Sequence, residues 1–265
     1  IVKSIFKKRR RQQGSFKRIS WLKEKILKHQ EDQQIKTARM DRFLVSYKRP
    51  YELLHTFREI FEREIYRFSS NKPSPVIIDC GANIGLSVLY YKDLFPAAQV
   101  IAFEPDQSNF HLLERNVAQN HLNDVTLYQK AVWIADETIS FSANETEASH
   151  IVTDKNTGVT VPAIRFRDFL TQFDEIDFLK IDIEGAEWAV IRDCATSLSK
   201  VQKLFLEYHG KVHETEKLTH LLSIANNAGF SVYIKMAADH LAFPFVEKTL
   251  GLAYDVQLNL FCYKN

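Results

Sequence analysis

At residues 76–85 the chain reads VIIDCGANIG. A short apolar run, 76–79, leads directly into a turn that contains two glycines, and a helical pattern follows over 86–95. Gly81 allows the backbone to approach a ligand closely, and Gly85 allows a helix to pack tightly against a strand. In α/β folds such a strand–turn–helix unit lies at the carboxyl ends of parallel strands, where ligands bind.

The same alternation of strand and helix continues along the chain from this turn. Apolar strands that alternate with helices predict a doubly wound α/β domain, in which helices cover both faces of a mostly parallel sheet. The expected strands are 76–79, 100–104, 125–131, 138–141, 160–163, 178–181, 203–207, 231–234 and 257–262, the last two as an antiparallel edge pair. The expected helices are 86–95, 108–121, 167–173, 188–194 and 216–228.

A basic, helical N-terminal extension is expected before this domain. The sequence KPSP at 72–75 interrupts regular structure, which predicts an extension over 1–74 and a domain over 75–265. Residues 1–30 contain eleven Lys and Arg and a single acid, Glu24, whereas the remainder of the chain has a net charge of −8. Apolar residues recur at helical spacing around 21–35 and again over 41–68. A solvated helical arm is the simpler interpretation, and contact of residues 1–30 with anionic lipid or nucleic acid is the alternative.

Composition excludes several classes of protein. A hydrophobic fraction of 45% and a charged fraction of 26% are typical of globular domains rather than of disordered chains. The sequence contains no apolar run long enough to span a membrane and no signal-peptide pattern, so we expect a cytoplasmic protein, with peripheral membrane attachment as an alternative. Three isolated cysteines, Cys80, Cys194 and Cys262, are expected to be buried thiols rather than zinc ligands or disulfides.

The glycine turn also indicates the kind of ligand. A dinucleotide-binding turn needs the pattern G-x-G-x-x-G, which this chain lacks. Asp79 stands just before the first glycine, and its negative charge suits a cationic ligand, such as a sulfonium with an amino acid tail, better than a pyrophosphate. Glu104 ends the next strand, where a carboxylate can accept both hydrogen bonds of a ribose diol. Asp106 is the leading candidate for the adenine side, followed by Gln107, Lys130 and Ala131.

Four segments resemble the FkbM-type methyltransferases: VIIDCGANIGLS at 76–87, AFEPD at 102–106, KAV at 130–132 and FLKIDIEGAE at 178–187. The resemblance extends over roughly residues 75–263 and implies a seven-stranded sheet, S-adenosylmethionine as methyl donor and methylation of a hydroxyl. Members of the family are often associated with sugars of surface polysaccharides or with secondary metabolites. The cofactor-binding candidates are then Asp79, Gly81, Asn83, Gly85, Glu104, Asp106 and Ala131.

A second group of acidic residues follows the strand at 178–181. Asp182, Glu184 and Glu187 stand close together, and their mutual repulsion requires a compensating group: a cation, a metal, substrate hydroxyls or Lys180. Capping of the next helix is the alternative explanation, above all for Glu184 and Glu187.

The next strand ends in Glu207 and His209, which should approach Asp182 and Glu184. His209 or Asp182 is expected to take the proton from the acceptor hydroxyl. The alternative is a divalent cation held by Asp182, Glu184 and Glu207, which would lower the pKa of that hydroxyl.

The acceptor is expected to be a hydroxyl of a small molecule or glycan. Two variable stretches, 142–158 with Ser149 and His150 and 236–254 with His240, are candidates for covering the site. A nucleic-acid methyltransferase guided by the basic arm is one alternative, although the chain lacks the Asn-Pro-Pro-aromatic motif of amino-methylating enzymes. An NAD-dependent oxidoreductase is disfavoured by the glycine pattern, and a non-catalytic binding module is a further alternative. The sequence does not indicate the oligomeric state.

Overall fold

The computed structural model describes residue 16 and residues 18–141, 159–239, 243–246 and 253–264. The chain forms two compact units, Ile1–Arg67 and Phe68–Asn265. The units meet in sequence at Arg67 and Phe68, whereas the expected boundary lay between residues 74 and 75. Phe68 belongs to the second unit because its ring stacks on Phe178 with centroids 4.5 Å apart.

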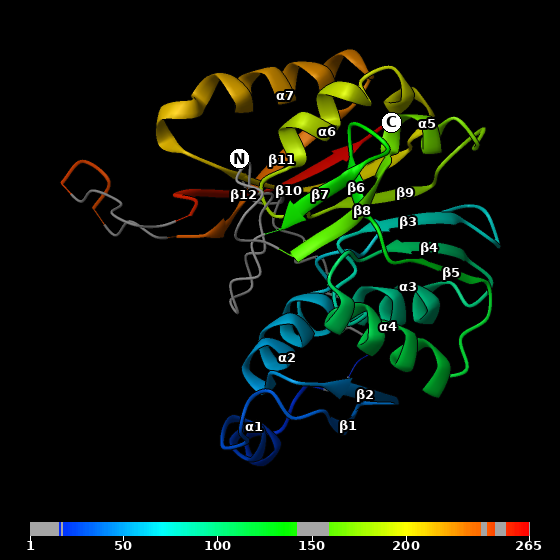
Figure 1. Cartoon of the computed structure of the whole chain (residues 1–265), viewed down its shortest axis with the longest axis vertical. Helices are drawn as coiled ribbons and strands as arrows, with labels where there is room; N and C mark the ends of the chain where they lie inside the picture. Colours follow the sequence, from blue (N-terminus) through cyan, green and yellow to red (C-terminus); the bar gives the residue numbers. More distant parts are fainter. Residues whose placement is uncertain (1–15, 17, 142–158, 240–242, 247–252, 265) are drawn as a thin grey trace, which may run out of the picture. The chain divides into compact units, whose positions relative to one another are not determined.

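The second unit is built on a seven-stranded sheet, as the family resemblance implied (Figure 1). Its strand order is β11-β12-β10-β9-β3-β4-β5. β12 lies between β10 and β11 and runs antiparallel to both, so the last strand is inserted into the sheet rather than added at its edge. The strands are β3 (Val76–Cys80), β4 (Gln99–Phe103), β5 (Val125–Tyr128), β9 (Phe178–Ile181), β10 (Lys203–Gly210), β11 (Ser231–Ala238) and β12 (Val256–Tyr263).

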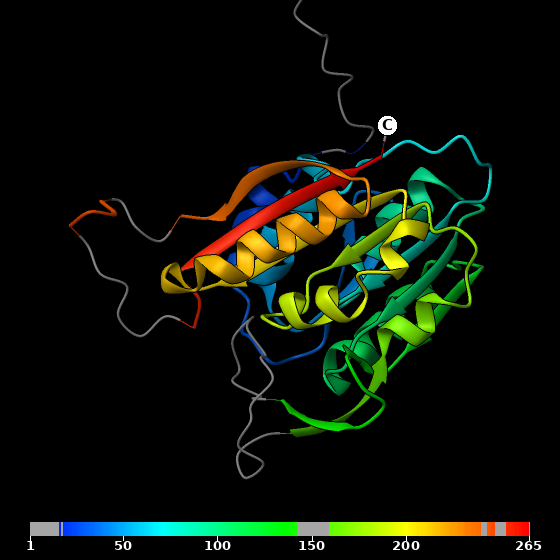
Figure 2. The ribbon, with the colours of Figure 1, turned by 90° about the horizontal axis from the view of Figure 1, so that it is seen from above.

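Helices cover both faces of this sheet, which confirms the doubly wound architecture (Figures 1 and 2). One face carries α3 (Leu86–Leu94) and α4 (Gln107–Gln119). The other face carries α5 (Phe166–Leu170), α6 (Glu187–Asp193) and α7 (Thr215–Asn227), together with the short η2 (Ser197–Lys200) and η3 (Val212–Glu214).

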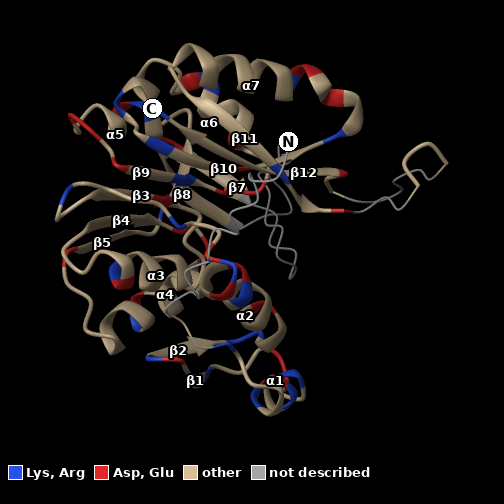
Figure 3. Ribbon diagram, turned by 180° about the vertical axis from the view of Figure 1, so that it is seen from behind, with Lys and Arg blue, Asp and Glu red and all other residues tan. Residues whose placement is uncertain are grey.

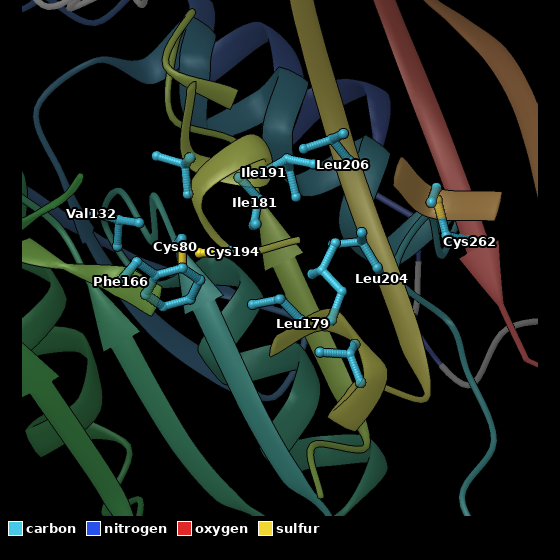
Figure 4. Packing of buried hydrophobic residues seen from close by; sticks show 14 of the residues in the cluster. Cys80, Val132, Phe166, Leu179, Ile181, Ile191, Cys194, Leu204, Leu206 and Cys262 are labelled. Atoms are coloured by element: carbon cyan, nitrogen blue, oxygen red, sulfur yellow. The ribbon is translucent and has the colours of Figure 1, made fainter. Parts of the chain in front are cut away.

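The pleat of the strands decides which residues meet each layer of helices. Ile78 and Cys80 of β3 join the main apolar core with α5, α6 and α7, and Figure 4 shows Cys80 beside Phe166 and Cys194. Asp79 lies between them in sequence, so its side chain points to the opposite face, toward α3. The three cysteines are buried and free.

A separate three-stranded sheet with order β6-β8-β7 follows β5. Its strands are β6 (Ala131–Trp133), β7 (Thr138–Phe141) and β8 (Val159–Arg165). The single strand predicted over 125–131 is therefore wrong. The chain leaves the large sheet after Tyr128, and Ala131 pairs with Ala163 in the small sheet instead.

The first unit is only partly helical. Its elements are α1 (Trp21–Lys28), β1 (Lys36–Met40), β2 (Phe43–Tyr47), α2 (Pro50–Phe57) and the π-helical turn η1 (Arg58–Glu62). The helix predicted from residue 41 begins instead at Pro50, because proline lacks an amide hydrogen and suits the first turn of a helix. An antiparallel hairpin precedes it, with Asp41 in the left-handed region (φ 52°) at its turn. Within the part of the chain that is described, no helix has the length and apolar character of a membrane span.

Candidate functional site

The glycine loop between β3 and α3 uses all its backbone amides internally. Every amide of residues 81–85 donates to an acceptor in the protein, so this loop offers no free amides to a pyrophosphate. The pairs are Gly81 N to Phe103 O (3.0 Å), Ala82 N to Phe103 O (2.9 Å), Asn83 N to Glu104 Oε2 (2.8 Å), Ile84 N to Asn83 Oδ1 (2.7 Å) and Gly85 N to Ala82 O (2.8 Å). This geometry argues against dinucleotide binding, in agreement with the glycine pattern.

Glu104 lies at the carboxyl end of β4 and ties the glycine loop to the start of α4. Its two carboxylate oxygens accept hydrogen bonds from Asn83 N (2.8 Å) and Asp106 N (2.9 Å). Burial raises the pKa of Glu104 to about 7, although the two amide hydrogen bonds act in the opposite direction. A carboxylate offers about four acceptor positions, so those not used by the amides remain for a ligand.

Lys180 lies buried beneath the glycine loop. Its ammonium group donates to Gly81 O (2.7 Å) and Cys80 O (3.3 Å). The same Nζ lies 3.4 Å from Asp79 Oδ1 and 3.4 Å from Asp182 Oδ2. Sequence analysis left several groups open that could compensate the acidic segment. In the structure Lys180 compensates the charge of Asp182.

Asp79 is placed differently from the expectation that it faces a ligand. It is fully buried, and it pairs across the sheet with Lys180, the residue directly opposite on β9. Its other carboxylate oxygen accepts a hydrogen bond from Ser87 of α3. Because the pleat directs this side chain under the loop, Asp79 neutralises Lys180 in this structure and makes no approach to solvent.

The two glycines of the loop make close contacts with the protein itself. A Cβ on Gly81 would lie 1.9 Å from Asp182 O, so the close approach is to the end of β9. A Cβ on Gly85 would lie 2.5 Å from Leu113 Cδ1, so this glycine packs α3 against α4 rather than against a strand. Both residues have positive φ, +83° and +87°.

The remaining cofactor candidates follow β4 and β5 in the chain. Asp106 caps α4, and its side chain accepts a hydrogen bond from Asn109 N (2.8 Å). Ala131 is buried and begins β6, and Gln107 begins α4.

A carboxylate–histidine cluster forms at the carboxyl ends of β9 and β10, and we use this name for Asp182, Glu184, Glu187, Glu207 and His209. The two strands are parallel neighbours with Ile181 opposite Leu206, so the residues that follow them meet at one edge. His209 Nε2 lies 3.5 Å from Glu184 Oε2 and 3.8 Å from Glu207 Oε1. One ligand atom each from Asp182, Glu207 and His209 lie within 4.8 Å of one another. The expected meeting of these residues is confirmed.

Glu187 organises this cluster from beneath. It is fully buried, and its carboxylate accepts hydrogen bonds from Ile183 N (3.1 Å) and Gly185 N (3.0 Å). His209 Nδ1 also donates to Glu187, at 3.2 Å. Helix α6 has no side-chain capping hydrogen bond, so the capping interpretation is not confirmed. Glu187 instead holds the turn before the helix and the imidazole.

The charges of the cluster are strongly coupled. Burial lowers the pKa of His209, but the hydrogen bond to Glu187 and the nearby carboxylates outweigh burial and raise it to about 10. Burial, with repulsion from Asp182, raises the pKa of Glu184 and of Glu207 to about 8. The surrounding carboxylates thus favour the protonated form of His209.

Tyr254 lies against the cluster, and sequence analysis did not identify it as a site residue. Its hydroxyl donates to Glu184 O (2.6 Å), and its ring lies 5.1 Å from that of His209. The C-terminal end of the predicted covering stretch 236–254 therefore reaches the cluster. Ser149, His150 and His240 lie outside the described residues.

The model of the methyltransferase FkbM domain matches residues 79–232. That range covers more than half of the chain and contains the glycine loop, Glu104 and the whole carboxylate–histidine cluster, but not Tyr254. The chain belongs to the FkbM methyltransferase family.

Individual relatives of this FkbM domain are distant. Methyltransferase sdnD of Sordaria araneosa is 28% identical over 172 residues, covering 51% of this chain and 66% of that protein, just under two thirds of its length. The 2-O-methyltransferase NoeI of Sinorhizobium fredii is 25% identical over 191 residues, covering 64% of this chain and 75% of NoeI. The crystal structure of methyltransferase FkbM from Methylobacillus flagellatus KT aligns with a TM-score of 0.48 and 20% identity, over 76% of this chain and 46% of that one.

Proposed function

We propose that this chain is an S-adenosylmethionine-dependent methyltransferase that methylates a hydroxyl of a small molecule or a sugar. Membership of the FkbM family supports methyl transfer. The relative NoeI is named a 2-O-methyltransferase, which supports oxygen as the acceptor atom. The observation that carries the proposal is the chemistry of the sheet edge, where loop amides are occupied and carboxylates gather.

The residues present fit a cationic cofactor. Carboxylates stand at the carboxyl ends of β4, β9 and β10, and burial raises the pKa values of Glu104, Glu184 and Glu207. A positive ligand would favour the ionised forms of these groups, whereas a phosphate would meet repulsion and no free loop amide. Glu104 would accept the ribose hydroxyls, and Asn83, Gly81, Gly85, Asp106 and Ala131 would shape the surrounding surface. Asp79 would act through Lys180 and the loop.

When bound, S-adenosylmethionine supplies a methyl group on a positively charged sulfur. The protein's part is to hold the acceptor oxygen in line with that methyl and to remove its proton. Asp182 suits the second task because it is partly exposed at the end of β9 and is already oriented by Lys180. His209 would orient the acceptor as a hydrogen-bond donor, because as an imidazolium it has no free lone pair for a proton.

A divalent cation is the alternative way to activate the hydroxyl. Asp182, Glu207 and His209 offer one ligand atom each within reach of a single ion, and Glu184 lies beside them. His209 would then bind as neutral imidazole, with its Nδ1–H held by Glu187. The two schemes differ in their response to a chelator. Proton removal by Asp182 predicts an unchanged rate, and activation by a cation predicts a lost rate.

The test is methyl transfer from labelled S-adenosylmethionine to a panel of sugar and small-molecule hydroxyls, with RNA as a further acceptor. We expect transfer to a hydroxyl, a loss of about 100-fold or more in Asp182→Asn, and a smaller loss in His209→Gln. Glu216→Gln, an exposed carboxylate on α7, is the matched control and should be unaffected. EDTA should leave the rate unchanged, and a rate abolished by EDTA and restored by Mg²⁺ would favour the cation.

Methylation of RNA alone, or transfer undiminished in both Asp182→Asn and His209→Gln, would contradict the proposal.

A further inference from the structure

Helix α1 is held in one orientation by contacts within the first unit. Leu27 is its only buried residue, at 2% exposed. Glu24 forms an ion pair with Arg58 of η1, and Lys23 donates a hydrogen bond to Arg39 O of β1. Residues 23, 24 and 27 lie on one side of a helix, so this side faces the rest of the unit.

The opposite side of α1 leaves large apolar side chains in contact with water. Trp21, Leu22 and Ile26 are 73%, 61% and 55% exposed. At 100° per residue they fall on one face together with Lys25, whose ammonium lies 5.3 Å from the centre of the Trp21 ring. A helix of eight residues with three such side chains turned outward is typical of a surface that is covered by a partner.

Basic residues surround this apolar face. Arg18, Lys25 and Lys28 are exposed at or beside α1, and Figure 3 shows the basic residues of this helix in blue. The preceding segment adds further lysines and arginines, so that residues 1–30 carry eleven basic residues against one acid. Phe16 packs edge-on against Phe61 with centroids 4.9 Å apart, and Ile19 N donates to Glu62 (2.8 Å). These two contacts hold Phe16 and Ile19 against η1.

We propose that the outward face of α1, together with the exposed basic residues Arg18, Lys25 and Lys28, docks on an anionic lipid surface. Lipid supplies both parts of the required partner: acyl chains and glycerol backbones for the apolar side chains, and negative headgroups for the basic ones. Tryptophan suits this boundary because its ring is apolar and its N–H can reach water. Nucleic acid would satisfy the charges but would leave Leu22 and Ile26 without an apolar environment. The chain therefore acts at a membrane surface without a spanning helix being required.

The experiment is co-sedimentation of the full chain with vesicles of phosphatidylcholine alone or with 30% phosphatidylserine, and in parallel a binding titration with a single-stranded RNA. We expect binding only to the phosphatidylserine vesicles and a decline with added salt. Trp21→Ser with Ile26→Ser should weaken vesicle binding about ten-fold or more, and Arg18→Glu with Lys25→Glu should do the same.

The matched control is Tyr233→Ser with Met236→Ser on β11, two residues with similar exposure, 57% and 60%. This control should bind vesicles like the unmodified chain. The proposal would be overturned if the chain bound no vesicles, or bound uncharged vesicles equally well. It would also be overturned if the control lost as much binding as Trp21→Ser with Ile26→Ser. The same holds if the chain bound RNA but no vesicles, and RNA binding survived Trp21→Ser with Ile26→Ser.

Discussion

Glu104 illustrates how a single buried carboxylate connects the fold to the site. Its two oxygens hold Asn83 and Asp106 through their amides, so the residue ties the glycine loop to the start of α4. Burial nevertheless makes its ionised form unfavourable and raises its pKa from 4.5 to about 7. The folded protein therefore binds the proton of Glu104 more tightly than the unfolded chain does.

This difference in proton affinity predicts a pH dependence of stability. The stabilisation is fully present below pH 4.5 and is lost as the pH rises through about 7. Between pH 5 and pH 8 the free energy of unfolding should fall, with a contribution from Glu104 of up to about 3 kcal/mol. Urea denaturation of the unmodified chain and of Glu104→Gln at several pH values measures this contribution. The variant should lose only the part of the pH dependence of the free energy of unfolding that Glu104 causes. Equal slopes in both proteins would show that Glu104 does not titrate in this range.

At the scale of elements, the turn between β9 and α6 carries the chemistry of the cluster. Gly185 has φ +97°, and a Cβ there would lie 2.0 Å from the Tyr254 hydroxyl oxygen. Tyr254 in turn holds the main chain of Glu184, which is itself in the left-handed region (φ 54°). The turn is therefore fixed from above by Tyr254 and from below by Glu187.

Replacing Gly185 by alanine should disturb this turn more than backbone strain alone would. The matched control is Gly229→Ala, which has a similar φ of +87° but only a lysine carbon, 4.0 Å away, near the added methyl group. We expect a loss of about 1 kcal/mol in Gly229→Ala and about twice that in Gly185→Ala, measured by urea denaturation.

Adding Tyr254→Ala to Gly185→Ala removes the clash. Relative to Tyr254→Ala alone, the cost of the glycine substitution should then return to about that of the control. If Gly185→Ala lowers the free energy of unfolding equally with and without the Tyr254 side chain, Tyr254 does not hold this turn.

The elements of the second unit could largely be predicted from sequence, because each apolar strand such as 178–181 is a local pattern followed by local turn residues. The contact of Lys180 with the glycine loop and the role of Tyr254 could not. Lys180 meets Gly81 and Tyr254 meets Glu184 only after the sheet has assembled, and these pairs are 99 and 70 residues apart. The hairpin of β1 and β2 was not predicted for a different reason. Its apolar residues also fit a helical spacing, whereas in the structure the helix begins only at Pro50.

The position of Asp79 shows the limit of reading a motif without its environment. An acid before the first glycine suggested a direct contact with a cationic ligand, whereas the buried Lys180 occupies that carboxylate in the structure. The sequence predicted correctly that Glu207 and His209 would approach Asp182 and Glu184, because parallel neighbouring strands end at the same edge. Which residue of that group takes a proton depends on coupled charges that no spacing reveals.

At the scale of the whole molecule, the candidate site lies at the carboxyl edge of one sheet. The ends of β3, β4, β9 and β10 bring a closed glycine loop, Glu104 and the carboxylate–histidine cluster to the same edge. Membership of the FkbM family and the acidic character of this edge together favour a positively charged methyl donor over a nucleotide with free phosphates. The first unit carries a separate surface, the outward face of α1, whose proposed binding to anionic lipid is tested independently of the site.

The most direct measurement is calorimetric titration of the unmodified chain with S-adenosylmethionine and S-adenosylhomocysteine, beside NAD. The account predicts one site per chain for each sulfur compound, no binding of NAD, and an affinity about ten-fold or more lower in Glu104→Ala, which corresponds to about 1.4 kcal/mol. Glu216→Gln should bind both compounds like the unmodified chain. Folded protein that takes up neither sulfur compound, or that binds them equally well without the Glu104 carboxylate, would contradict it.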